Sequence, residues 1–134
     1  MARSYRELLV WQKAKALAVH LYQSTERFPK TETYGLTSQT RRAAVSVASN
    51  IAEGQGRLTS GEFLHFLGQA TGSLLELDTQ LAIARDLAYL DRDEQMSLAE
   101  EIYQALGLLN RLIDSLRHKR VALPGNSETL KPVH

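Results

Sequence analysis

The chain has 134 residues and a mass of 15.0 kDa, which is the usual size of one domain and enough to bury a core without disulfides. It has no cysteine, which excludes a disulfide framework, a cysteine-based zinc or iron–sulfur site and a cysteine nucleophile. The formal net charge of +1 announces no nucleic-acid or membrane partner, and no apolar run reaches the ~18 residues that span a bilayer, so we expect a soluble cytoplasmic protein.

The first half of the chain predicts two helices. Apolar residues recur at three- and four-residue steps over residues 6–26 and predict the first helix, which Phe28-Pro29 should end because a residue before proline disfavours the helical conformation. The second predicted helix covers residues 37–53 and stops at Gly54, a residue suited to the left-handed position after a helix. This helix is rich in alanine and serine, so its small side chains should let neighbouring helices approach closely.

The third predicted helix, residues 60–87, is long and strongly periodic. Thr59 and Glu62 have the spacing of a capping box at its start. From Phe63 to Ala88, apolar residues alternate steps of four and three, which is the pattern of a heptad seam. A second apolar row flanks this seam, so the apolar surface is wider than one partner helix requires.

The fourth predicted helix, residues 91–117, opens with Asp91 and Glu94 at capping-box spacing and carries another broad apolar band. Four helices with short connections predict an all-α, antiparallel up-and-down four-helix bundle over residues 1–120, followed by a mobile C-terminal tail over residues 121–134. Since the apolar bands exceed the needs of a four-helix core, we expect other subunits to cover part of them.

One pair of residues has metal-ligand spacing. Glu62 and His65 form the Glu-x-x-His pattern of ferritin-like di-iron bundles, but such a site needs two of these pairs and two further carboxylates. His20, His118 and His134 have no glutamate three residues before them, and Glu62 and His65 fall on the polar side of the heptad seam. A capping glutamate and a surface histidine are therefore the favoured interpretation; a metal-dependent enzyme is a third alternative, and no metal or cofactor is expected.

A polar stripe runs along the predicted second helix at spacings of i, i+4, i+7 and i+11. Serine, asparagine and arginine on an alanine-rich helix indicate partial burial, and buried polar groups need partners, which the third helix offers on one face. The stripe consists of Arg42, Ser46, Ser49 and Glu53, and Asn50 lies beside it. The predicted network consists of Arg42, Ser46, Asn50, Glu53, Ser73 and Glu76. Fixing the helix register explains this network at least as well as ligand binding does.

Basic residues outnumber acidic ones in the first 57 residues, whereas acids gather between Glu76 and Glu101, and this asymmetry favours an anionic partner. The glycines at residues 54 and 56 could form a phosphate-binding loop, but such a loop follows a strand, and no strand is predicted before them. A helix stop and a turn are therefore the favoured interpretation. No catalytic constellation stands out, and no enzyme activity is expected. The residues predicted to contact nucleic acid are Arg41, Arg42 and Arg57.

Several segments resemble one protein family. Residues 41–54 read RRAAVSVASNIAEG and match its pattern of Arg-Arg-Ala, then Ser, then Asn-Ile-Ala-Glu-Gly; residues 9–14 (LVWQKA), 28–39 and 62–77 fit the same pattern. On these motifs the chain is similar, over about Leu8 to Leu116, to the bacterial four-helix-bundle proteins encoded in intervening sequences of 23S ribosomal RNA genes.

The resemblance implies an up-and-down four-helix subunit that assembles as a homopentamer, with no known enzyme activity and no cofactor. The position of the family's genes, and its similarity to the pentameric accessory proteins of diversity-generating retroelements, suggest a nucleic-acid role. We therefore expect a non-enzymatic oligomer that binds nucleic acid or a nucleoprotein partner through basic residues. The alternative is a purely structural or protein-interaction oligomer with no nucleic-acid binding.

Overall fold

The computed structural model describes residues 4–122, which form four α-helices and two short 3-10 helices and contain no strand. The α-helices are α1 (Leu9–Thr25), α2 (Leu36–Gln55), α3 (Ser60–Asp86) and α4 (Arg92–Ala122), and the 3-10 helices are Tyr5–Glu7 and Lys30–Glu32. The expected all-α class is confirmed. Most of the expected tail lies outside the described residues, and α4 itself continues to Ala122 rather than ending at residue 117.

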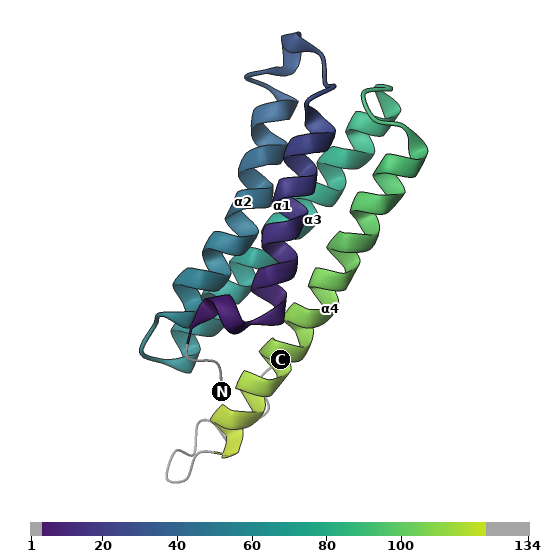
Figure 1. Cartoon of the computed structure of the whole chain (residues 1–134). Coiled ribbons are helices and arrows are strands. Elements are labelled where there is room, and N and C mark those ends of the chain that lie inside the picture. The colour runs from purple at the N-terminus through teal and green to yellow at the C-terminus, as the bar shows by residue number, and fades with distance from the viewer. Residues whose placement is uncertain (1–3, 123–134) are drawn as a thin grey trace.

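The helices are arranged in chain order around one core (Figure 1). Helix α1 packs against α2 and α4, and α3 packs against the same two helices, so that α1 and α3 lie diagonally across the bundle. The lower end of α4 projects beyond the other helices in Figure 1. Within the described part of the chain, no helix combines the length and apolar character needed to cross a membrane.

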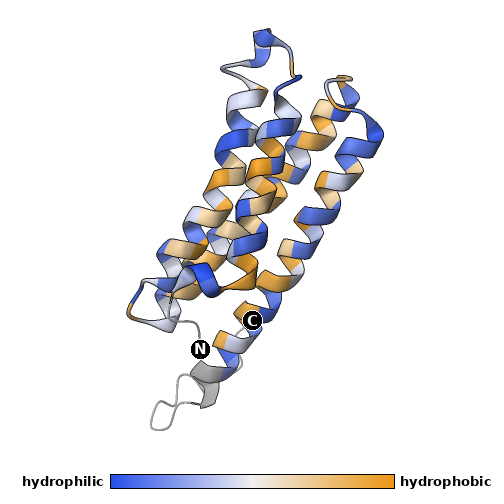
Figure 2. Cartoon of the chain, in the orientation of Figure 1, coloured by the Kyte–Doolittle hydropathy of each residue, from blue (hydrophilic) through white to orange (hydrophobic). Residues whose placement is uncertain are grey.

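The core is built from the predicted periodic positions. Along each helix the ribbon in Figure 2 alternates between apolar and polar residues, and the buried apolar residues of all four helices form one cluster. Each fully buried leucine or isoleucine stabilises the bundle by about 1.5–3 kcal/mol relative to leaving it exposed. The largest fully buried apolar side chains are Leu17, Leu21, Val47, Ile51, Leu67, Leu74, Leu77, Leu81, Leu98, Ile102 and Leu109.

Gly54 does not end α2, contrary to the sequence prediction. The helix continues to Gln55, and Gly54 is buried against α3. A Cβ atom at this position would lie 2.8 Å from Cδ1 of Phe63 and 2.9 Å from Cβ of Phe66. The glycine is therefore needed for the close approach of α2 and α3, the pair of helices with the most extensive contact, and not for a left-handed turn.

The first helix also begins later than predicted. The Ser4 hydroxyl accepts a hydrogen bond from the Arg6 N–H at 3.2 Å, and the Glu7 side chain accepts one from the Ser4 N–H, which together make a capping box. This box starts a separate 3-10 helix. Leu8 is extended, with φ −73° and ψ 124°, so α1 starts at Leu9.

The expected heptad seam stops short of Ala88, which is exposed and has a positive φ of 63°. The Tyr89 N–H donates to the Ala84 carbonyl and the Ala88 N–H to the Arg85 carbonyl, both at 2.9 Å, which is the Schellman pattern of a helix end. The turn directs Tyr89 across the bundle, where its hydroxyl donates to Glu32 Oε2 at 2.9 Å.

Glu32 connects this corner to the start of α2. Its Oε1 accepts the Leu36 N–H at 2.9 Å, and this backbone hydrogen bond, followed by the one from Tyr89, holds the pKa of Glu32 below its ordinary 4.5. A Cβ atom at Gly35 would lie 2.5 Å from Glu32 Oε1, so a glycine leaves room for this cap.

Candidate nucleic-acid interface

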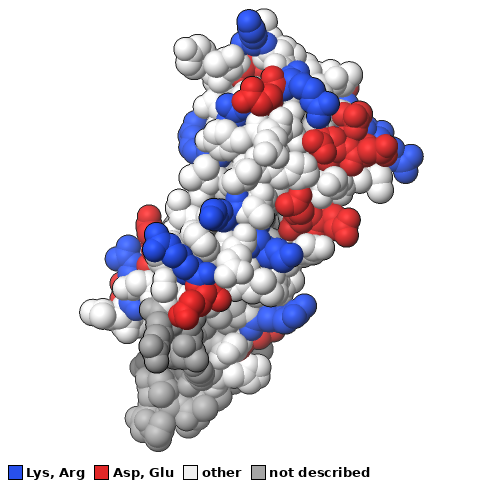
Figure 3. All heavy atoms as spheres, in the orientation of Figure 1, with Lys and Arg blue, Asp and Glu red and all other residues white. Residues whose placement is uncertain are grey.

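Charge is distributed unevenly among the helices. Helix α1 carries Lys13 and Lys15 and no acidic residue, whereas α3 carries four acidic residues and a single arginine. Basic side chains lie along the α1 side of the view in Figure 3, and acidic side chains gather over the upper half of α4. The charges on α1 are therefore more favourable to an anionic partner than those on α3.

A shallow hollow of about 590 Å³ lies along the first half of α2. Its wall contains two arginines and several hydroxyl groups and no acidic residue; the lining residues are Tyr22, Thr33, Thr37, Ser38, Arg41, Arg42, Val45 and Ser46. Thr37 and Ser38 belong to the first turn of α2, where the helix dipole favours negative charge. In composition the hollow suits a phosphate group or another anion.

Arg41, one of the predicted nucleic-acid contacts, is occupied within the protein. Its Nε donates to Thr25 Oγ1 at 2.9 Å and its Nη2 to the Tyr22 carbonyl oxygen at 3.2 Å. The guanidinium carbon lies 4.6 Å from the centroid of the Tyr22 ring, and Nη2 lies 3.7 Å from Glu26 Oε1. Arg41 thus attaches α2 to the C-terminal turn of α1, a role that the sequence did not indicate.

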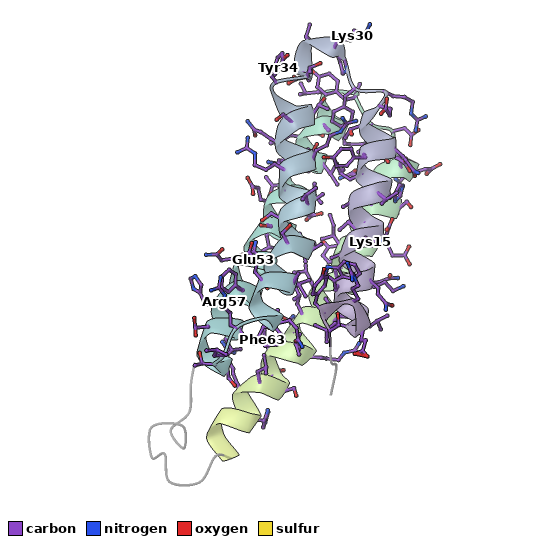
Figure 4. All side chains as sticks on the ribbon, turned by 60° about the vertical axis from the view of Figure 1, so that its left-hand side comes forward. Lys15, Lys30, Tyr34, Glu53, Arg57 and Phe63 are labelled. Atoms are coloured by element: carbon purple, nitrogen blue, oxygen red, sulfur yellow. The ribbon has the colours of Figure 1, made fainter. Side chains whose placement is uncertain are left out.

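Arg42 and Arg57 are exposed. Arg42 makes no hydrogen bond or ion pair with any residue that the structure describes, whereas the Arg57 guanidinium lies 4.5 Å from the Phe66 ring centroid. At ~1.5 Å per residue, Arg42 lies about 20 Å from the end of α2 at Gln55, and Arg57 follows two residues beyond that end. Figure 4 shows Arg57 near the lower end of α2, on the other side of the view from Lys15, so the predicted arginines do not form one cluster.

The predicted polar network is smaller than expected. The hydroxyl groups of Ser46 and Ser73 are hydrogen-bonded at 3.0 Å, and Asn50 Nδ2 donates to the Ser46 carbonyl oxygen and hydroxyl, each at 2.9 Å. These three side chains form a neutral link between α2 and α3. They are half-buried, in agreement with the partial burial expected for this part of the stripe.

The other members of the predicted network lie outside this link. Arg42, Glu53 and Ser49 are exposed, because only the Ser46 side of the stripe faces α3. Glu76 accepts its hydrogen bond from Gln80 on its own helix, at 3.4 Å. The sequence spacing identified one stripe but not the direction from which α3 covers it.

A second hollow, of about 580 Å³, follows the groove between α1 and α2. Its wall includes Trp11, Lys15 and Tyr22 and contains no acidic residue. The Trp11 ring packs edge-on against Tyr5 with a centroid distance of 5.1 Å, and Lys15 Nζ lies 5.6 Å from the Trp11 ring centroid. Aromatic and basic side chains side by side are typical of surfaces that bind single-stranded nucleic acid.

A charged cluster between α1 and α4 was not predicted. His20 Nε2 lies 3.3 Å from Glu94 Oε1, and His20 Nδ1 makes a short contact with Glu101 Oε2. Glu94 also accepts a hydrogen bond from the Ser24 hydroxyl at 2.6 Å and lies 3.7 Å from Arg27 Nη2. The sequence offered only one signal for this cluster. His20 and Ser24 are four residues apart and the two glutamates seven, and these spacings place each pair on one face of its helix.

Glu62 and His65 do not form a metal site. Both are exposed; Glu62 contacts its capping residue Thr59, and His65 accepts a hydrogen bond from Gln69 at 3.1 Å. Between residues 4 and 122, no group of three or more histidine, aspartate or glutamate side chains is arranged to hold a metal ion.

Comparison with known proteins identifies the family to which the chain belongs. No curated protein matches the chain in sequence. The fold is similar to that of a protein of unknown function from the S23 ribosomal protein family of Bacteroides thetaiotaomicron VPI-5482, with a TM-score of 0.71 and 20% identity over 78% of this chain and 98% of that one. A model of the 23S rRNA-intervening sequence protein family matches residues 6–111. The chain therefore belongs to the 23S rRNA-intervening sequence protein family.

Proposed function

We propose that the chain is a non-enzymatic subunit of a homo-oligomer, a pentamer by its family resemblance, that binds nucleic acid through Arg42 on α2 and through Arg57 in the turn after this helix. The observation that carries this proposal is the hollow on α2, in which the exposed Arg42 has no partner among the described residues and no acid lines the wall. A guanidinium beside hydroxyl groups and the positive end of a helix provides the donors that phosphate oxygens accept.

Exposed apolar side chains support the oligomer. Leu75 on α3 is 53% exposed, and on α4 Met96 is 54% and Tyr103 62% exposed. Large apolar side chains exposed on two helices favour burial against another subunit. Each added subunit brings another copy of the α2 hollow, and several weak contacts to one strand can raise affinity by ~100-fold or more.

The test measures how RNA affinity depends on salt concentration in the parent, in a variant that lacks the proposed binding arginines and in a control variant that lacks arginines elsewhere. Each phosphate contact with a single strand contributes about 0.7 to the slope of log affinity against log salt concentration. We expect the double variant Arg42→Gln/Arg57→Gln to bind RNA more weakly and with a flatter slope, while sedimentation shows the oligomer of the parent. The matched control is the double variant Arg92→Gln/Arg111→Gln, which removes two exposed charges from α4 and should leave affinity unchanged.

Two outcomes contradict the proposal. An intact oligomer of the double variant with parental RNA affinity rejects binding at these arginines and supports the purely structural alternative. A parent chain that sediments as a stable 15.0 kDa monomer at micromolar concentration rejects the oligomer itself.

A further inference from the structure

The charged cluster around His20 holds one edge of α1 against α4. The imidazole ring lies between two carboxylates, and its side chain is 24% exposed. Nε2 faces Glu94 at 3.3 Å, and Nδ1 faces Glu101. The two glutamates are two helical turns apart on α4, about 10 Å along its axis. Their carboxylates reach the ring from these two positions, and each contacts a different ring nitrogen.

This geometry suits only one protonation state of the ring. A neutral imidazole has one N–H group and one lone pair, whereas the imidazolium has two N–H donors. Ionised carboxylates accept hydrogen bonds and cannot donate them. A neutral His20 therefore leaves a lone pair directed at one of the carboxylates, while a charged His20 satisfies Glu94 and Glu101 together.

We propose that His20, Glu94 and Glu101 form a proton-operated clasp, which closes the seam between α1 and α4 when His20 is protonated and loosens it when the proton leaves. On the α1 side of the clasp, Ser24 and Arg27 contact Glu94 directly. They hold this carboxylate in place whatever the charge on His20. Among the described residues, the hydrogen-bonding and ion-pair partners of the ring come from α4 alone.

The electrostatics of the cluster agree with its geometry. Partial burial lowers the pKa of His20, but the hydrogen bonds and charges of Glu101 and Glu94 outweigh burial and raise the pKa above 6.5. The pKa of Glu94 is lowered below 4.5, chiefly by the hydrogen bond from Ser24 and also by His20 and Arg27. Glu94 therefore stays ionised where His20 becomes charged.

These directions fix the pH window of the clasp. A raised histidine pKa gives stability that is complete below 6.5 and is lost as the pH rises through the folded-state pKa of His20. A lowered glutamate pKa gives stability that is present above 4.5 and is lost as the pH falls through the folded-state pKa of Glu94. The clasp is closed most firmly between about 4.5 and 6.5 and loosens on the alkaline side.

Two measurements on the full chain test the clasp. NMR titration of the His20 ring should give a pKa above 6.5, and this pKa should fall in Glu101→Gln. The thermal midpoint of the parent should drop by several degrees relative to that of His20→Gln between pH 6 and pH 8, because the variant has no proton to lose. His65→Gln is the matched control, since His65 is exposed and contacts its own helix, and it should keep the parental pH profile.

Hydrogen exchange locates the effect. After correction for the intrinsic pH dependence of exchange, amides in the half of α1 around His20 should lose more protection between pH 6 and pH 8 than amides of α3. A His20 pKa at or below 6.5, or the same thermal pH profile in the parent and in His20→Gln, overturns the proposal. If His20→Gln does not fold, the comparison is made with Glu101→Gln, and an unchanged profile in that variant overturns the proposal equally.

Discussion

Helix α1 is held by two polar clusters of different chemistry. On its α2 edge, Arg41 donates to neutral oxygens of Thr25 and Tyr22 and lies over an aromatic ring. On its α4 edge, His20 lies between two carboxylates. The guanidinium is always charged in proteins, whereas the imidazole changes charge near neutral pH. One edge is therefore permanently attached and the other is attached conditionally.

The difference shows what each cluster can contribute. The main acceptors of Arg41 are neutral, and the one carboxylate near it, that of Glu26, is exposed at 3.7 Å. This attachment therefore depends little on pH or salt. Two carboxylates around a titratable cation give an attachment whose strength depends on the protons available. The same helix can thus keep its place against α2 while its contact with α4 varies.

The largest expected effect follows from removing the permanent attachment. Arg41→Met removes the hydrogen bonds to the Thr25 hydroxyl and to the Tyr22 carbonyl, which keeps only its bond from the Thr25 hydroxyl, and loses the contact with the ring. We expect a cost of about 2–3 kcal/mol in the free energy of unfolding. Urea denaturation should give the same loss at pH 6 and at pH 8. The neighbouring variant Arg42→Met should stay within about 0.5 kcal/mol of the parent, because Arg42 is exposed. A pH-dependent loss in Arg41→Met contradicts the comparison.

A smaller effect is expected at the neutral link between α2 and α3. Asn50→Leu removes two hydrogen bonds to Ser46 but leaves the bond between Ser46 and Ser73, so we expect a loss of about 1 kcal/mol at any pH from 5 to 8. Ser49→Leu, on the exposed side of the same stripe, is the matched control. Full parental stability in Asn50→Leu, measured by urea denaturation, shows that the link does not stabilise the bundle.

The smallest effect is expected at the conditional edge. Glu101→Gln removes one of the two carboxylates that face His20, and for a partly exposed pair the loss at pH 6 should be below about 1 kcal/mol. At pH 8 the variant and the parent should converge. Urea denaturation at the two pH values measures the difference, and a loss that is equal at both contradicts the conditional role of this edge.

The sequence predicted the fold well, because helical periodicity is a local property. Ser60 and the N-terminal cap at Thr59 were placed correctly, since the cap requires only residues three positions apart. Gly54 was misread, because a glycine near the end of a helix has the same sequence signature whether it stops the helix or admits a neighbour. Only the approach of Phe63 and Phe66 distinguishes the two cases.

The candidate site was predicted less well, because it depends on contacts between distant segments. Arg41 and Arg42 are adjacent in the sequence, yet one contacts α1 and the other faces solvent. Their separate roles depend on where α1 lies, which residue spacing on α2 does not reveal. His20 meets glutamates that are 74 and 81 residues away, so no local pattern indicated the cluster.

The corner at Ala88 has a consequence for the order of folding. A left-handed backbone costs a residue with a Cβ atom roughly 1–2 kcal/mol, and glycine avoids this cost. The isolated α3–α4 hairpin therefore lacks a turn that forms readily by itself. Its corner is stabilised by the hydrogen bond from Tyr89 to Glu32, a contact with a segment 57 residues away. We expect this corner to reach its final shape after the first half of the chain has docked.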